Sequence, residues 1–196
     1  MRAPVWIALL AIGLSGCSMP TDPAGMPACE EPASGLNSTL VLIAQSVPTA
    51  SQLPCVRSVP VGWEYDGFRA RNGGAQFQLI ASREESQEIV VELRDECDLT
   101  GASRLPSQQP GIRRFERITA TGSTYVGERY HVYEGGCTTY RFDIPGTTGR
   151  QTLNTVAASL GFVSRQTVSQ QVYDRSEGRL ELDPSPSAAP SSGGGA

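Results

Sequence analysis

The first sixteen residues have the layout of a secretory signal, and this layout decides which part of the chain folds and where it folds. Arg2 gives a short positive start, and the run from Val5 to Leu14 contains only apolar and small residues. A charged start, an apolar middle and a small-residue exit are typical of an export signal. The run is too short to cross a membrane core of roughly 30 Å, which requires about 20 residues. We therefore expect the remaining chain to fold outside the cytoplasm.

The end of this segment resembles the lipobox of bacterial lipoproteins. Leu14 stands three residues before Cys17, and the small residues Ser15 and Gly16 lie between them. The resemblance implies cleavage before Cys17 and a diacylglyceryl thioether on its thiol. Stable anchoring requires two or more acyl chains, at about 0.8 kcal/mol per buried methylene. The sequence thus predicts a protein anchored by lipid, palmitate included, on the extracytoplasmic face of the cell membrane; an ordinary cleaved signal with a chance cysteine is the alternative.

Cysteine usage agrees with export. Beyond Cys17 the chain has four cysteines, Cys29, Cys55, Cys97 and Cys137. An even number in an exported domain predicts two disulfides, and the sequence does not choose among the three possible pairings. Four buried free thiols are the alternative. A zinc site is disfavoured because the cysteines lie far apart and His131 is the only histidine. We expect no metal and no cofactor.

The charge balance limits the partners that we expect. All 16 basic residues are arginines, against 20 acidic residues, and the net charge is −4. Removal of residues 1–16 takes away Arg2 and leaves −5. A nucleic-acid binder requires a basic face, so we expect no nucleic-acid partner.

Composition divides the chain into four parts. Residues 1–16 are the lipoprotein signal peptide, and residues 17–36 are the lipidated cysteine with a proline-rich spacer. Residues 37–183 form the predicted globular domain. Residues 184–196 hold only proline, serine, alanine and glycine, and we expect this tail to be disordered.

The first half of the domain predicts a helix followed by strands. Ser38 is a plausible N-cap for a helix whose apolar face holds Leu40, Ile43, Ala44 and Val47, although a buried strand is possible. Residues 49–60 are expected to form a turn and an extended link. Strands are predicted over 63–70, 76–80 and 89–93, with a β-bulge at Gly67 and a turn at 72–74.

The second half predicts more strands and then helices. Strands are expected over 112–119, 129–134 and 137–144. Thr147 or Thr148 is expected to cap a helix that ends at Gly161 in a left-handed conformation, with Phe162 folding back on it. A second helix is predicted from Ser164 to near Gly178, and a short strand over 180–182. The fold class is therefore α+β: an antiparallel β-sheet of five to seven strands with the C-terminal helices packed on one face.

Three segments resemble a family of uncharacterised exported proteins of high-GC Gram-positive bacteria. They are residues 46–57 with the following Gly62-Trp63, residues 135–142 and residues 160–165. The resemblance covers most of the domain. The family brings no activity that can be carried over to this chain.

His131 is the first candidate for chemistry, because histidine titrates near neutral pH and serves as a general base. The chain has no G-x-S-x-G motif, and its cysteines are expected to be disulfide-bonded. A hydrolase using His131 with Asp143 or a nearby serine is therefore only an alternative. A histidine on the face of a sheet is favoured.

Other polar clusters have ordinary explanations that we favour. Asp95, Glu96 and Asp98 are calcium-type ligands without the pattern of a calcium loop, so a solvated acidic face is expected. Arg113, Arg114 and Arg117 suit an anionic polymer or a phosphate, although pairing with acids is favoured. Five aromatic residues suggest either a sugar-binding face or ordinary packing, the favoured reading: Trp63, Tyr65, Tyr130, Tyr133 and Tyr140.

Together these patterns favour a lipid-anchored module of the cell envelope that binds an unknown ligand, such as an envelope protein or polymer. An enzyme is not expected. The alternatives are the hydrolase and a purely structural envelope component.

Overall fold

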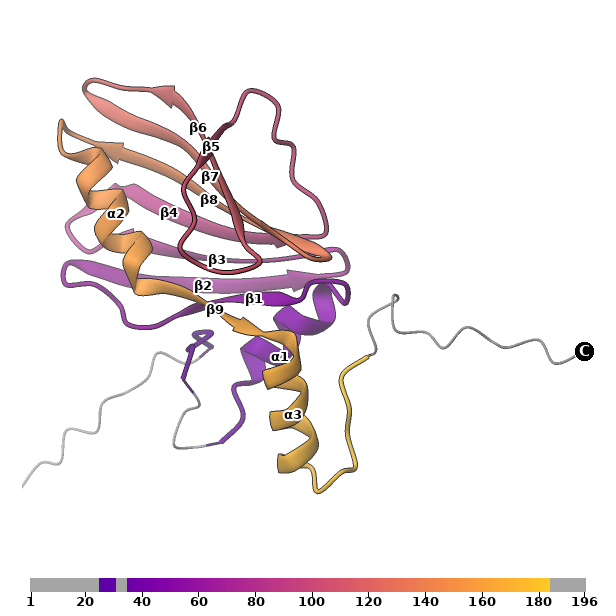
Figure 1. The fold of residues 1–196 in the computed structure, drawn as a ribbon. Coiled ribbons are helices and arrows are strands. Elements are labelled where there is room, and N and C mark those ends of the chain that lie inside the picture. Colours follow the sequence, from indigo (N-terminus) through magenta and orange to yellow (C-terminus); the bar gives the residue numbers. More distant parts are fainter. Residues whose placement is uncertain (1–24, 31–34, 184–196) are drawn as a thin grey trace, which may run out of the picture.

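One antiparallel sheet of seven strands forms the body of the protein (Figure 1). The structure is a computed structural model that describes residues 25–30 and 35–183. The predicted signal peptide, Cys17 and the tail 184–196 lie outside the described residues. The predicted α+β class is confirmed, and the described residues form three helices beside the sheet.

The large sheet consists of two meanders joined side by side. The strand order is β2-β3-β4-β8-β7-β6-β5. The first meander contains β2 (Trp63–Arg71), β3 (Gly74–Ala81) and β4 (Glu84–Arg94), and the second contains β5 (Ser103–Leu105), β6 (Arg113–Ala120), β7 (Thr124–Tyr133) and β8 (Gly136–Pro145). The bulge at Gly67 is confirmed, because the pairing of β2 with β3 shifts between Tyr65 and Phe68 and Gly67 has a φ of 71°.

A second sheet of two strands pairs distant parts of the chain. β1 (Gln52–Val56) runs antiparallel to β9 (Leu160–Ser164), with Cys55 opposite Gly161. The predicted left-handed helix end at Gly161 is therefore wrong, because the chain goes straight from helix into strand. A Cβ at Gly161 would approach the Arg57 Nε to 2.6 Å, so glycine makes room for this side chain. The predicted link over 49–60 thus contains a strand.

The three helices cover different parts of the structure. α1 (Ser38–Ser46) buries Leu40, Ile43 and Ala44, which confirms the predicted apolar face; its N-cap is Asn37 and not Ser38. α2 (Gly149–Ser159) contacts β7, β8 and β9 and lies across one face of the large sheet, whereas α3 (Arg165–Arg175) packs beside α1 and β9 (Figure 1). Ser164 caps α3 as predicted, and its hydroxyl accepts a hydrogen bond from the Thr167 amide. None of the described helices is long and apolar enough to cross a membrane.

Residues 180–182 are not a strand, which corrects that prediction. They follow α3 as irregular backbone, and only Leu182 is buried. Their apolar alternation therefore reflects one buried contact and not a paired strand.

The core has two parts, one around α1, α3 and β1 and the other between the large sheet and α2. Strand residues that alternate on one face of the sheet meet Leu153 and Val156 of α2. Leu79, Ile89, Val91 and Ile144 are fully buried in this layer. Burying each aliphatic side chain of this kind stabilises the fold by about 1.5–3 kcal/mol, so this layer fixes the position of α2 on the sheet.

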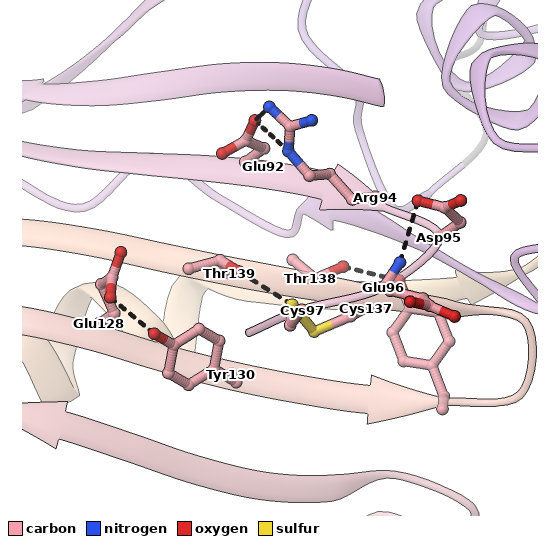
Figure 2. The surroundings of a disulfide bond; sticks show 11 residues. Glu92, Arg94, Asp95, Glu96, Cys97, Glu128, Tyr130, Cys137, Thr138 and Thr139 are labelled. Atoms are coloured by element: carbon pink, nitrogen blue, oxygen red, sulfur yellow. Dashed lines mark hydrogen bonds and ion pairs between the residues drawn. A yellow bond between two sulfur atoms is a disulfide. The ribbon is translucent and has the colours of Figure 1, made fainter. Parts of the chain in front are cut away.

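Two disulfides are present, as predicted, and the structure selects their pairing. Cys29 bonds to Cys55 of β1, and Cys97 bonds to Cys137 of β8. Figure 2 shows the second disulfide beside Thr139, whose hydroxyl lies 3.2 Å from the Cys97 sulfur. The first disulfide ties the spacer to the two-stranded sheet, and the second ties the segment after β4 to β8. A disulfide typically stabilises a domain by about 2–4 kcal/mol.

The turn between β7 and β8 fits closely against the segment before β1. Gly135 has a φ of 67°, and a Cβ on it would overlap the carbonyl oxygen of Thr49. The Ser51 amide also donates a hydrogen bond to the Glu134 carbonyl, at 3.0 Å. This contact docks the second meander against the two-stranded sheet.

We predict that Gly135→Ala lowers the free energy of unfolding by more than about 3 kcal/mol, because positive-φ strain and a backbone overlap both act there. Gly62→Ala is the matched control: Gly62 has a φ of 82°, and a Cβ there meets nothing within 4 Å. It should cost about 1–2 kcal/mol from its φ alone. Urea denaturation of both variants checks this, and equal losses would contradict the close fit.

Candidate functional site

A cavity of about 360 Å³ opens on the inner face of the sheet, the face that carries α2. Its walls come from β6, β7 and β8, from α2 and β9, and from the loop between β5 and β6. Three arginines line it: Arg57, Arg114 and Arg129. We call this cavity the arginine pocket.

Strand alternation brings the polar side chains of the pocket together. Arg114 of β6 is opposite His131 of β7, and Arg129 of β7 is opposite Tyr140 of β8. Side chains two residues apart share a face, so Arg129 and His131 continue the inward row that starts at Tyr125. The inner face is therefore apolar under most of α2 and polar beside it.

His131 is buried in the wall of the pocket, with 6% of its surface exposed. Its ring lies between Tyr140 and Phe162, with centroid distances of 4.6 and 5.3 Å. Burial, and then the charges of Arg114 and Arg129, lower the pKa of His131 to about 3. The imidazole is therefore neutral at neutral pH. Its Nδ1 is buried without a hydrogen-bond partner in the described structure.

Arg129 is the compensated cation of the pocket. Its Nε and Nη2 donate to one oxygen of Glu116 at 3.0 and 2.7 Å, and Nη2 also donates to Asn154 of α2 at 3.1 Å. The side chains of Arg129 and Glu116 are 6% and 12% exposed. This shielded ion pair places one negative charge next to one of the three guanidiniums.

Arg114 and Arg57 have no such partner among the described residues. Arg114 donates only to the Pro106 carbonyl, at 3.3 Å, and its Nε is buried without a partner. Arg57 is exposed, and no carboxylate forms an ion pair with either side chain. Burial and the nearby charge of Arg129 lower the pKa of Arg114.

The pKa of Tyr140 is affected by all three guanidiniums of the pocket. Burial raises the pKa of its hydroxyl, and the charges of Arg129, Arg114 and Arg57 act in the opposite direction. All three guanidiniums thus lie close enough to act on one phenol. No Asp or Glu is among the described residues that line the pocket.

The predicted cluster of Arg113, Arg114 and Arg117 is divided between the two faces of the sheet. Arg117 forms an ion pair with Glu128 and lies 4.0 Å from Asp98, which confirms the favoured pairing for this residue. Arg113 is exposed. Arg114 alone points to the inner face, because neighbouring residues in a strand alternate.

His131 and Asp143 are not brought together, so the structure gives no support to that pair. His131 is opposite Thr138 on the inner face, whereas Asp143 is exposed on β8 and opposite Val126. Ser107 is a serine in the pocket wall, but its hydroxyl donates to the Gln109 carbonyl at 3.3 Å and makes no hydrogen bond to His131.

The other candidates do not gather into a site. Asp95 and Asp98 accept hydrogen bonds from nearby backbone amides, and in the described part of the chain no group of three or more acidic, histidine or cysteine side chains is placed to hold a metal ion. Tyr130 lies on the face opposite to Tyr140 and donates to Glu128 at 2.6 Å (Figure 2). Trp63 and Tyr65 of β2 pack against the core and not against the pocket.

Sequence reasoning missed Arg57 and Arg129. Arg129 was detectable, because strand alternation from Tyr125 places it inward. Arg57 carried no signal, because its position depends on the pairing of β1 with β9.

We predict that His131 makes stability depend on pH. Its pKa is lower in the folded state than in the unfolded state, so the unfolded state binds more protons below about pH 6.5, and stability falls as the pH drops towards 3. Between pH 7 and pH 5 this loss amounts to about 2 kcal/mol. Urea denaturation of the wild type and His131→Gln at both pH values isolates the effect, since the chain has no other histidine. Equal pH dependence in the two proteins would refute it.

Comparison with known proteins finds no match for this chain. It matches no family model, no curated protein and no solved structure. The chemistry of the arginine pocket is therefore the basis of the functional argument.

Proposed function

We propose that this protein is a lipid-anchored binding module of the cell envelope that holds an anionic group in the arginine pocket. The observation that carries the proposal is the charge of the pocket. Three guanidiniums line the pocket together with Tyr140, and of these three only Arg129 has a carboxylate partner among the described residues. A guanidinium left without a counter-charge in a partly enclosed cavity favours a ligand that supplies one.

The pocket differs in charge from the protein as a whole. The protein as a whole is acidic, with a net charge of −4. Uncompensated arginines at one place therefore select anions through direct contact and not through the overall field. Elsewhere in the described structure, five ion pairs join arginines to carboxylates, through Arg94, Arg117, Arg141 and Arg179.

Binding suits the site better than catalysis. A general base works best with a pKa near the operating pH and with a partner that orients it. His131 has a pKa of about 3 and lies next to arginines, with no carboxylate bonded to its ring. The neutral imidazole of His131, packed between aromatic rings, suits the wall of a binding site.

The proposed anchor rests on the sequence. Residues 14–17 match a lipobox, and the acyl chains on Cys17 would hold the domain at the outer surface of the membrane. The two disulfides agree with export. The disulfide of Cys29 joins the spacer to β1, so the tether would enter the domain next to the two-stranded sheet.

We predict that Cys17→Ala abolishes lipidation and blocks cleavage of the signal peptide. Metabolic labelling with a fatty-acid analogue, followed by detergent phase separation, checks this. Cys29→Ala is the control, because it also removes a cysteine and should keep the label. Equal labelling of the wild type and Cys17→Ala would contradict the anchor.

We also predict that Arg114→Gln weakens the binding of anions by about tenfold or more, since hydrogen bonds to charged groups contribute about 1.5–3 kcal/mol. Calorimetry would use aromatic probes of one size: benzoate and phenyl phosphate as anions, benzyl alcohol as the neutral probe and benzylammonium as the cation. At least one anion should bind, and the neutral and cationic probes should not.

Arg113→Gln is the matched control for this test. Arg113 is the chain neighbour of Arg114, but it is exposed on the other face of β6. Its loss should change the affinity by less than about twofold. Equal effects of the two substitutions, or binding of the cation, would contradict an anion site in the arginine pocket.

A further inference from the structure

We infer that the anionic group held by the arginine pocket is a dianionic phosphomonoester. This inference rests on the proposed binding function and specifies its ligand class. Four features of the pocket lead to it: the number of uncompensated charges, the elements that carry the donors, the buried polar atoms without partners, and the apolar part of the wall.

The charge of the pocket calls for a dianion. Glu116 neutralises Arg129 through two hydrogen bonds. Arg57 and Arg114 remain, and neither has a carboxylate partner within the described part of the chain. A carboxylate or a phosphodiester would neutralise one of these two cations. A phosphomonoester carries close to two negative charges at neutral pH and neutralises both.

The donors approach the pocket from separate elements. Arg57 follows β1, Arg114 belongs to β6, and Tyr140 belongs to β8. A planar carboxylate is typically held by one guanidinium fork. Arg114 and Tyr140 belong to one face of the large sheet, and Arg57 comes directly after a strand of the two-stranded sheet. A phosphoryl group has three terminal oxygens that point in different directions, and it suits donors that come from two layers of the structure.

Two buried nitrogen atoms of the pocket wall lack partners, and this observation is independent of the charge. They are the Nδ1 of His131 and the Nε of Arg114. Buried polar atoms without hydrogen bonds are rare and costly, and each calls for an explanation. Both lie beside one cavity but are covered by neighbouring atoms, so a ligand oxygen would reach them only after a rotation of the His131 or Arg114 side chain; a neutral imidazole has one N–H to donate.

The organic group of the ester fits the apolar part of the pocket wall. The wall beside β9 and α2 is apolar and contains Leu160, Phe162 and Ala157. A volume of about 360 Å³ exceeds what a phosphate alone fills and lies within the usual range of small-ligand pockets. The pocket therefore fits a phosphate joined to a small apolar or aromatic group.

The decisive test compares three probes that share a phenyl ring by calorimetry at constant ionic strength. They are phenyl phosphate, which is a dianion at about pH 7.5, methyl phenyl phosphate, which is a monoanion, and benzoate. Phenyl phosphate should bind about tenfold or more tightly than either monoanion. Arg57→Gln and Arg114→Gln should each reduce this preference to less than about threefold, whereas Arg113→Gln should leave it unchanged.

A pH series adds a second readout. The last proton of a phosphomonoester leaves with a pKa of about 6, so lowering the pH from about 7.5 to about 5 should weaken phenyl phosphate binding by about tenfold. His131 stays neutral over this range, because its pKa is about 3. The other charged or ionisable groups at the pocket are Arg57, Arg114, Arg129, Tyr140 and Glu116. Methyl phenyl phosphate, whose charge is constant, is the control for any effect of pH on the protein itself.

The outcomes separate this inference from the proposed function. Equal affinity for the monoester and the diester, or tighter binding of benzoate, would overturn the phosphomonoester and leave the anion site standing. Failure of all three anions to bind would refute both.

Two further probes would identify the source of the ester. Glycerol 3-phosphate represents a soluble ester, and dihexanoyl phosphatidic acid represents a lipid-borne one. Each probe is compared with the phosphodiester of the same organic group. Tighter binding of either monoester than of its diester supports the inference and assigns the source. A lack of preference for the monoester in both comparisons contradicts the inference.

Discussion

The pairing of β4 with β8 is the contact on which the rest of the structure depends. These strands are separated by more than forty residues, and their pairing turns two meanders into one sheet. It places Ile89 beside Phe142 and Val91 beside Tyr140, which are all buried in the core. The disulfide of Cys97 and Cys137 lies at one end of this pairing and shortens the loop that the chain must close.

The pocket is a consequence of how this sheet is covered. α2 lies over β7 and β8, and the two-stranded sheet covers a neighbouring part of the inner face. The polar inward residues of β6 and β7 are left beside α2, where Phe162 of β9 and the loop before β6 close over them. An apolar core and a charged cavity therefore share one face of the sheet, and their boundary follows the edge of a helix.

Local patterns predicted the local structure well. Sequence patterns predicted six of the seven strands of the large sheet, the glycine in β2 predicted its bulge, and Ser164 predicted the start of α3. Residues 103–105 were missed, because three residues are too few for alternation to be visible. β9 was assigned to the end of a helix, because Gly161 is typical of a helix end and its partner β1 lies about a hundred residues earlier.

The pocket was harder to predict for the same reason. Arg113, Arg114 and Arg117 form a cluster in the sequence, but strand alternation separates them in space. Arg57, Arg114 and Arg129 meet only through the pairing of β1 with β9 and of β6 with β7. Short-range patterns contain no information about such pairings, so the sequence indicated the residue types of the site and only one of its three arginines.

The attachment of Cys29 to β1 also has a mechanical meaning. Residues 27–29 lie along β1, where the Cys29 amide donates to the Val56 carbonyl and the Val56 amide donates to the Pro27 carbonyl, at 2.9 and 2.7 Å. A pull on the chain before Cys29 would load these two hydrogen bonds, but the bond between Cys29 and Cys55 carries the force covalently into the strand. Tension from a membrane tether would thus reach the domain one residue before Val56 and two before Arg57, without unzipping the sheet.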